Sequence, residues 1–340
     1  MKSNSNTVCN TGSGNGSLNS SSYSAYATYL ASFVSQFKSH YGAPLYALSV
    51  QNEPDYCPTT YDGAIWTPAQ IDSFVKTNLG PTLAGTGVGV MMPETSTWAD
   101  VYGDLQTGLA SYSNPCMTDS SCAQYIKVVA SHGYEGNYSA CQNLGSAHCW
   151  ETEVYLGSPT FDGSMANGLT VAKDIHNFLT IANGSAYLYW RIWNSANDNQ
   201  GLLNPTTEAP TSRYYVMGNW SKFGRPGWVR IEATVNPMSG VYVTAFKDPA
   251  TDGFAIVAVN QNSSPANLDF SLAGFPSVTT VTPTLTSASA NLANQSNLDI
   301  SGGEFSYSLP ASSVVTFHGT ASSSSTKNVA APTSLALTVH

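Results

Sequence analysis

The chain has 340 residues, of which 42% are hydrophobic and 11% aromatic, enough apolar material for one large domain or two smaller ones. Only 10% are charged, well below the roughly 25% of ordinary soluble domains. The net charge of −9 argues against nucleic acid as a partner, because binding phosphates needs a basic face. The sequence has no run of about 18 apolar residues, so we expect no membrane span.

Six cysteines favour an oxidising compartment, although residues 1–17 lack the apolar core of a secretion signal. The cysteine spacing fits no paired Cys-x-x-Cys zinc pattern. We therefore expect a secreted protein, and six reduced thiols in a cytosolic protein are the alternative. Cys116 and Cys122 bracket one short loop and Cys141 and Cys149 another, which favours these two disulfides, and Cys9 and Cys57 remain as the third pair.

The first 226 residues alternate short apolar runs with helical patterns. A helix is predicted over 21–40, where serines offer the N-cap and Gly42 and Pro44 end the pattern. A nearly all-apolar strand follows at 45–54, and the next helix opens at Thr67-Pro68 with proline in its first turn. Further strands are predicted at 88–94, 126–134, 149–155 and 186–193, and further helices at 98–109, 168–182 and 213–223.

Strands that alternate with helices at this spacing indicate βαβ units and a parallel sheet of about five strands. A closed (β/α)8 barrel needs eight strands. An open doubly wound sheet is the alternative, but it would require a glycine-rich phosphate turn after its first strand, and QNEPDY contains none. The pattern therefore favours a partial (β/α)8 barrel.

From about Gly227 the pattern changes to alternating residues separated by Gly, Asn, Ser and Pro turns. This period of two predicts an antiparallel β-sandwich of about eight strands. The predicted organisation is a barrel domain over 1–226, N-terminally incomplete, and a sandwich over 227–320. A Ser-rich tail or linker over 321–340 completes it.

Two glutamates stand where predicted strands meet loops. Glu53 ends the strand LYALSVQN, and Glu153 lies near the end of HCWETEV. Carboxylates at the C-terminal ends of parallel strands occupy the usual position of a barrel active site. Glycoside hydrolysis needs two such groups, one as proton donor and one as nucleophile or base. An ordinary exposed glutamate is the alternative for each residue taken alone.

Three segments resemble glycoside hydrolase family 30, a family of retaining hydrolases with a (β/α)8 barrel and an attached β-sandwich. They are SVQNEPDY (49–56), SHGY (131–134) and WETEVY (150–155). The stretch at 17–34 resembles the segment just after the third barrel strand of that family. The resemblance runs from residue 1 to about Gly319, and it implies that the first three barrel strands are missing here.

By this resemblance Glu53 would be the general acid/base and Glu153 the nucleophile, with Asn52 hydrogen-bonding the sugar 2-hydroxyl. Glu151 is a rival nucleophile, since regular alternation would put it on the same strand face as Glu153. Glu94, at the end of VGVMMPE, is a third strand-end carboxylate, which could equally serve as partner to a neighbouring polar group.

Aromatic rings should form the sugar-binding surface, because pyranose C–H faces stack on them. Core packing is the alternative for each ring. His132, two residues before Tyr134, is expected to be structural and to hold a backbone group or a carboxylate. The candidates are Tyr134, Trp190 and Tyr155 at strand ends and Trp66 and Trp98 in loops, of which Tyr134 and Trp190 match family positions.

Two departures from the family pattern affect the functional prediction. Glucuronoxylan-specific members of the family carry an arginine where this chain has Asn194, and an amide cannot replace the bidentate ionic contact of arginine with glucuronate. An open five-stranded arc would also expose hydrophobic edges, so we expect either inactivity or rescue by pairing between chains.

The leading hypothesis is a secreted endo-β-1,4-xylanase that works by double displacement on a polysaccharide. The alternatives are a β-1,6-glucanase or a glucosylceramidase-like hydrolase of the same family, and a non-catalytic carbohydrate-binding protein. We expect no cofactor, metal ion, nucleic acid or membrane partner, and we expect self-association through the open edge of the barrel.

Overall fold

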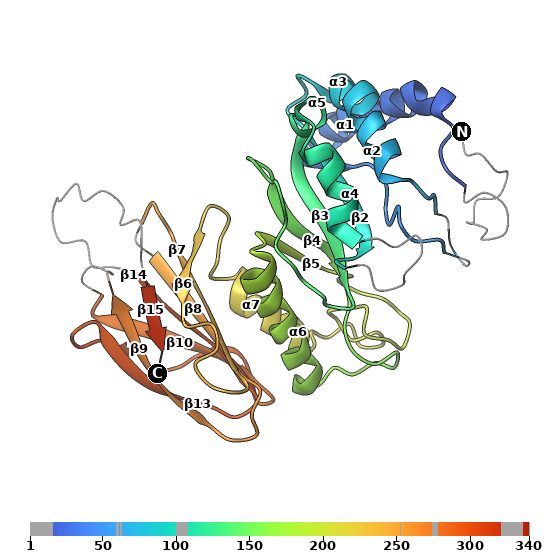
Figure 1. The fold of residues 1–340 in the computed structure, drawn as a ribbon. Helices are drawn as coiled ribbons and strands as arrows, with labels where there is room; N and C mark the ends of the chain where they lie inside the picture. Colours follow the sequence, from blue (N-terminus) through green and yellow to red (C-terminus); the bar gives the residue numbers. More distant parts are fainter. Residues whose placement is uncertain are drawn as a thin grey trace. The chain divides into compact units, whose positions relative to one another are not determined.

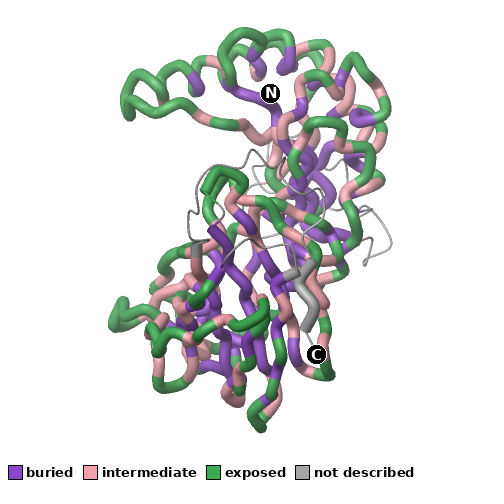
Figure 2. Tube along the Cα trace, turned by 90° about the vertical axis from the view of Figure 1, so that its left-hand side faces the viewer, coloured by how far each residue is buried: buried purple, intermediate pink, exposed green. Residues whose placement is uncertain are grey.

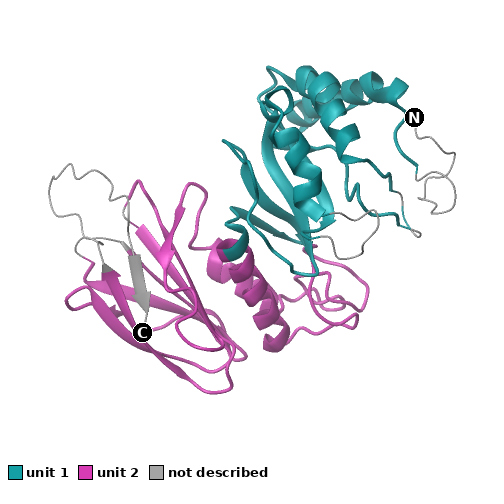
Figure 3. Cartoon of the chain, in the orientation of Figure 1, with its two compact units in different colours: residues 1–154, 181–189 teal, residues 155–180, 190–340 magenta. Residues whose placement is uncertain are grey.

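The computed structural model describes residues 16–58, 61, 63–99, 108–251, 253–273, 278–320 and 336–339. The chain divides into two compact units, one of residues 1–154 and 181–189 and one of residues 155–180 and 190–340 (Figure 3). The predicted boundary at 226/227 marks where helices stop alternating with strands, and it stays a prediction. Within the described part of the chain, no helix has both the length and the apolar character needed to cross a membrane.

The first unit is built on a parallel sheet in the order β1-β2-β3-β4-β5 (Figure 1). The strands are β1 (Ala47–Ser49), β2 (Gly89–Thr97), β3 (Ile126–Tyr134), β4 (His148–Val154) and β5 (Ala186–Tyr189). The central strands β2 and β3 are buried along most of their length, as expected of strands covered on both faces, whereas β1 and β5 at the sheet edges are only partly buried. All five predicted parallel strands are confirmed.

The helices of this unit follow from local signals in the sequence. Gly42 ends the first helix in a left-handed conformation, with φ 68°, and its N–H binds the carbonyl of Lys38. Thr67 and Gln70 form a capping box ahead of Pro68. The helices are α1 (Tyr23–Tyr41), α2 (Pro68–Phe74), α3 (Gly80–Leu83), α4 (Gly108–Met117) and α5 (Ser120–Ala123), with short turns η1 (Ser20–Ser22) and η2 (Val75–Leu79).

The helix predicted over 98–109 falls mostly on residues outside the described ranges, and the described helix α4 spans Gly108–Met117. On α1, the aromatic side chains of Phe33 and Tyr29 are 45% and 64% exposed. The buried face of α1 is instead formed by Tyr23, Ala27, Leu30 and Val34. Self-association through the sheet edge stays a prediction.

Disulfides link nearby segments of the first unit. Cys116 pairs with Cys122 and Cys141 with Cys149, with Cα–Cα distances of 5.2 and 6.1 Å, so both predicted pairs are confirmed. Cys57 is also disulfide-bonded, and its predicted partner Cys9 lies outside the described residues.

The second unit contains α6 (Met165–Asn177), which continues as the π-helical turn η3 (Phe178–Ala182), and α7 (Ser212–Ser221), followed by the β-sandwich. Polar contacts join α7 to the sandwich, because Asn219 donates to Thr316 Oγ1 and Trp220 Nε1 donates to Thr244 Oγ1, each at 3.0 Å. The sandwich therefore packs on α7 within the second unit.

The sandwich pairs its strands in the order β11-β10-β14-β8-β7-β6-β15-β9-β13, with β12 on β10. Ten strands are described, two more than predicted. They are β6 (Val229–Ala233), β7 (Val241–Lys247), β8 (Gly253–Asn260), β9 (Ala266–Ala273), β10 (Thr280–Ser287), β11 (Ala290–Asn294), β12 (Leu298–Asp299), β13 (Glu304–Leu309), β14 (Ser313–Thr320) and β15 (Ala336–Val339). The strand β15 pairs with β9 and β6, so this part of the predicted tail is a strand and not a linker. The observed fold, a partial barrel followed by a sandwich, confirms the predicted fold class.

Buried residues run along the strands of the sandwich (Figure 2), where stacked phenylalanines form the centre of its core. Phe317 is fully buried and lies 4.9 Å from Phe270 and 5.2 Å from Phe305 between ring centroids. We expect Phe317→Ala to lower the free energy of unfolding of the sandwich by about 3–5 kcal/mol, because it leaves a cavity. Denaturant unfolding would measure this, with Val229→Ala as an exposed control expected to stay within about 0.5 kcal/mol.

Candidate active site

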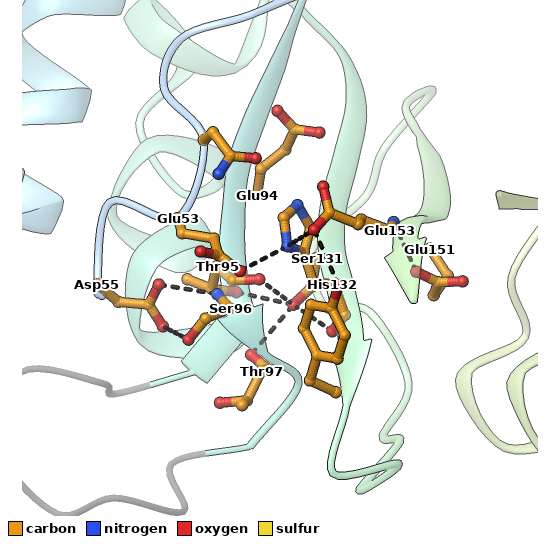
Figure 4. Close-up of polar contacts among 12 residues, drawn as sticks. Glu53, Asp55, Glu94, Thr95, Ser96, Thr97, Ser131, His132, Glu151 and Glu153 are labelled. Carbon is orange, nitrogen blue, oxygen red and sulfur yellow. Dashed lines mark hydrogen bonds and ion pairs between the residues drawn. The ribbon is translucent and has the colours of Figure 1, made fainter. Parts of the chain in front are cut away.

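Acidic and imidazole side chains meet at the C-terminal ends of the parallel strands. Glu53 lies in the loop after β1, His132 in β3 and Glu153 in β4, and Figure 4 shows these side chains pointing toward one another. One carboxylate oxygen from each glutamate and one ring nitrogen of the histidine all lie within 4.8 Å of each other. The structure thus brings together the two glutamates that the sequence singled out.

His132 lies between the two carboxylates and contacts both. Its Nδ1 is 3.0 Å from Oε1 of Glu53 and 3.7 Å from Oε1 of Glu153. The imidazole is 1% exposed, so water does not screen these contacts. The sequence predicted a structural histidine holding a carboxylate. Its position between the two glutamates could not be predicted, because no local pattern signals it.

Backbone irregularities aim the carboxylates into the site. Glu53 and Glu94 have positive φ angles of 47° and 57°, which lie in the left-handed region that residues other than glycine rarely adopt. The two are joined by a hydrogen bond of 2.9 Å from Glu53 N to Glu94 O. Glu94 is also the extra residue of a bulge in β2, between Pro93 and Thr95. Its side chain accepts a hydrogen bond from Ser49.

A second bulge places the two rival nucleophiles on different faces of β4. Ser131 pairs with Glu151, whereas the next residue, His132, pairs with Glu153, so β4 contains one extra residue there. Partners in a parallel ladder point to the same side, and neighbours along a strand point to opposite sides. Glu151 and Glu153 therefore point to opposite sides (Figure 4), and the expectation of a shared face is wrong. Glu151 is fully buried and accepts from Glu153 N at 2.7 Å.

Burial and the neighbouring His132 and Tyr134 shift the pKa of Glu153 in opposite directions. Burial raises the pKa of Glu153, and the His132 charge and a hydrogen bond from Tyr134 OH, at 2.9 Å, lower it again. The net direction is upward, helped by Glu53 and Glu94. Burial lowers the pKa of His132, but its hydrogen bond to Glu53 and the surrounding carboxylates outweigh this and raise it overall. A charged imidazolium thus supports an ionised Glu153.

Tyr134 should therefore control the acid side of any activity that uses ionised Glu153. We expect Tyr134→Phe to move the acid limb of the kcat/KM profile to higher pH, because the carboxylate loses a donor that stabilises its charge. Activity should recover most at alkaline pH. The measurement is a pH–rate profile beside Tyr41→Phe, an exposed control on α1. An unchanged acid limb in Tyr134→Phe would refute this role.

Asp55 anchors the loop that carries Glu53. It is fully buried, and its carboxylate accepts from Ser96 N at 2.8 Å and from Ser96 Oγ at 3.2 Å (Figure 4). Burial raises its pKa from 3.8 to about 6, against the opposing hydrogen bonds from Ser96. The loop is thus fixed to the end of β2 beside the two strained glutamates.

This raised pKa predicts a pH-dependent stability. The folded chain binds the Asp55 proton more tightly than the unfolded chain does, so the contribution of this group to stability is largest below pH 4 and is lost as the pH rises to about 6. Asp55→Asn should remove this fall, which amounts to a few kcal/mol. Urea unfolding of both proteins between pH 4 and 7 would test it. Parallel stability curves for the two proteins would contradict the assignment.

Tyr61 is a further site residue that the sequence did not reveal. Its hydroxyl donates to Oε2 of Glu53 at 3.1 Å, on the oxygen not bound by His132. Burial and the charge of Glu53 raise the pKa of Tyr61, so the phenol remains a donor. The side chain is 48% exposed, so a bound substrate could contact it. No motif in the stretch after NEPDY distinguishes this tyrosine from a surface residue.

The predicted sugar-binding residues have different surroundings. Tyr134 lies in the site, and Asn52, next to Glu53, is exposed. The prediction that Trp66 binds sugar needs correction, because this side chain is only 1% exposed. The rings of Tyr23 and Phe74 cover it, with centroids 5.5 and 5.3 Å from its own. It packs in the core because it directly precedes the capped start of α2.

Trp98, the other loop tryptophan, is also buried, at 2% exposure, and its Nε1 donates to Ser139 O at 2.7 Å. Trp190 is 40% exposed and Tyr155 half-buried, and both belong to the second unit. Their sugar-binding roles stay predictions.

Two groups of side chains in the described residues have the donors for a metal ion. One is the site itself, formed by Glu53, His132 and Glu153. Its donor atoms already contact one another or Tyr134, so a cation would have to replace those hydrogen bonds. The other combines Asp72 with Cys116 and Cys122, whose sulfurs are joined in a disulfide and cannot act as thiolates.

Comparison with known proteins identifies the family of the chain. Residues 1–180 match the glycosyl hydrolase family 30 TIM-barrel domain, and residues 227–317 match the β-sandwich domain of the same family. Glucuronoxylanase XynC from Bacillus subtilis (strain 168) is 35% identical over 293 residues. That alignment covers 83% of this chain, which spans only 63% of the length of XynC.

Solved structures agree with this match. The family 30 subfamily 8 xylanase Xyn30A from Clostridium acetobutylicum is 37% identical with a TM-score of 0.82, over 94% of this chain and 77% of that one. A family 30 endoxylanase from Clostridium papyrosolvens C71 is 30% identical with a TM-score of 0.77, over 93% and 76%. The domain matches cover both the half-barrel and the sandwich described above. The chain therefore belongs to glycosyl hydrolase family 30.

Proposed function

We propose that this chain is a retaining endo-β-1,4-xylanase in which Glu153 is the nucleophile and Glu53 the general acid/base. The observation that carries the proposal is the distance between the two carboxylates, whose oxygens lie within 4.8 Å. Retaining glycosidases hold their carboxyl groups about 5–5.5 Å apart, whereas inverting enzymes leave room for a water between them. The xylanase names of the relatives support the substrate.

In the first step Glu53 gives its proton to the glycosidic oxygen while the Glu153 carboxylate attacks the anomeric carbon. The bond to the leaving sugar breaks, and a glycosyl ester forms on Glu153. In the second step the Glu53 carboxylate takes a proton from water, the water attacks the anomeric carbon, and Glu153 is released. Two inversions give net retention of configuration.

The neighbouring residues would orient these groups. His132 and Tyr61 contact different oxygens of Glu53, which fixes the plane of its carboxyl group for proton transfer. Tyr134 holds Oε1 of Glu153 and supports its negative charge. The exposed Asn52 beside Glu53 would meet the sugar 2-hydroxyl, and the exposed Trp190 would stack on a xylose ring.

We further propose that cleavage does not require a glucuronate substituent on the xylan. Asn194 stands where the family resemblance implies arginine in glucuronate-dependent members, and its Nδ2 donates to both oxygens of Asp198, at 3.1 and 3.0 Å. An anionic substituent would meet the Asp198 carboxylate there, and this contact is repulsive. The disulfides and the polymeric substrate support action outside the cell.

The test is to incubate the chain with neutral arabinoxylan, glucuronoxylan and β-1,6-glucan and to follow the first-formed anomer by proton NMR. The proposal requires release of β-anomers from both xylans at comparable rates. Cleavage of β-1,6-glucan alone would favour the alternative glucanase activity. Binding without any cleavage would favour a non-catalytic carbohydrate-binding protein, and α-anomers would exclude the retaining mechanism.

A further inference from the structure

A pocket of about 450 Å³ lies in the second unit, and none of its described lining residues belongs to the candidate active site. It forms where the ends of β8, β10 and β14 meet the segment that follows α7. Its walls combine two cations, Lys222 and Arg225, with aromatic side chains that include Phe223 and Trp228, and with hydroxyl groups such as that of Thr282. This combination occurs on a chain with a net charge of −9 and only 12 Lys and Arg residues.

The end of α7 defines one side of the pocket. The helix contacts this sheet through Asn219 and Trp220 and ends at Ser221, and the residues that follow it line the pocket. The floor includes Gly253 and Gly319, which contribute no side chains. A Cβ atom on Gly253 would lie 3.4 Å from the indole ring of Trp228, so the ring borders this floor.

The charge at the pocket comes from Lys222 and Arg225, since His318 is neutral at neutral pH. Burial and the nearby Lys222 charge lower the pKa of His318, and its ring stacks on Phe223 at 4.5 Å. Among the described residues that line the pocket none is acidic. Asp248, which does not line the pocket, accepts a hydrogen bond from the lining residue Thr251.

Each component of the lining restricts the class of ligand. The half-buried ring of Trp228 suits the C–H face of a pyranose, and threonine hydroxyls suit its hydroxyl groups. The two cations favour an anionic group. Inorganic phosphate would use the cations alone, and a neutral sugar would use only the rings and hydroxyls. A uronic acid uses all three.

We propose that this pocket is a second carbohydrate site that binds acidic sugar units, such as the glucuronic acid side groups of xylan. The acidic-sugar chemistry follows from the pocket alone, and only the choice of xylan as the polymer rests on the proposed function. The pocket would hold substituted polymer on the enzyme, even though the Asn194–Asp198 pair disfavours an anionic group at its own position.

Calorimetric titration of the full chain with methyl β-D-glucuronide, methyl β-D-glucoside and inorganic phosphate would test this proposal. The glucuronide should bind about tenfold more tightly than the glucoside and than phosphate, and added salt should weaken it. The double variant Lys222→Gln/Arg225→Gln should lose about tenfold in glucuronide affinity. The charge-matched control Lys38→Gln/Lys173→Gln, with both residues exposed, should bind as the wild type does.

Hydrolysis of neutral xylotetraose should be equal in the wild type and in both double variants, since none of these residues is in the catalytic site. Unchanged glucuronide affinity in Lys222→Gln/Arg225→Gln would overturn the proposal. Equal affinity for phosphate and glucuronide would overturn the sugar specificity, leaving a simple anion site. Because the titrations do not use hydrolysis, a chain inactive on every xylan would refute the proposed function while leaving this test valid.

Discussion

Glu153→Gln is expected to lower kcat/KM on xylan by about four orders of magnitude or more, the largest effect of any single substitution in this chain. Glutamine keeps the size of the side chain and can still accept from Tyr134, but its amide cannot form the glycosyl ester. The variant should therefore fold and bind substrate normally. Initial rates on xylan, together with unfolding curves, would separate loss of chemistry from loss of structure.

Glu151→Gln is the matched control, because Glu151 lies two residues away on the same strand and has the same side chain. It points away from His132, and an amide oxygen can still accept from Glu153 N. We expect activity to fall by less than about tenfold, in keeping with a structural residue. Inactive Glu151→Gln beside active Glu153→Gln would reverse the assignment of the nucleophile.

Glu53→Gln is expected to lower kcat/KM on xylan by about 10²–10⁴-fold, because the leaving sugar departs poorly without a proton donor. With a 2,4-dinitrophenyl xylobioside the first step should be slowed by less than about tenfold, since this leaving group needs no proton. Rates on both substrates would be compared, with azide added to replace the water that Glu53 activates. Azide should restore turnover and give a β-glycosyl azide.

The two substrates make the role of Glu53 distinguishable from general damage to the site. If Glu53→Gln lost the same factor on xylan and on the activated glycoside, Glu53 would not be the proton donor. An α-glycosyl azide as product would exclude the double displacement. Asp55→Asn, which alters the same loop without removing a reacting group, should show no such difference between the substrates.

Much of the fold could be predicted from local signals that act over a few residues. Apolar runs such as LYALSV gave the parallel strands, and the Thr67-Pro68 capping pattern gave the start of α2. The tail shows where this fails. Residues 336–339 form β15 only because distant strands β6 and β9 offer them partners, and no local pattern reports such pairing.

The site was predictable only in part, for a similar physical reason. Glu53 and Glu153 stand at strand ends and were found from that position and from the family resemblance. The bulge at Thr152 was not predictable, so regular alternation gave the wrong face for Glu151. His132 and Tyr61 lie 79 and 8 residues from Glu53, and they meet it through tertiary structure. Trp66 was mistaken for a surface ring because burial depends on partners such as Tyr23.

The central claim is that two carboxyl groups from separate strands act on one glycosidic bond, with Glu153 as the group that bonds to sugar. Reaction with a 2-deoxy-2-fluoro-xylobiosyl fluoride, followed by proteolysis and mass spectrometry of the peptides, tests this most directly. We predict one covalent sugar per chain, carried on Glu153 in the peptide around WETEVY. A label on Glu151, or on any other residue, would contradict the account.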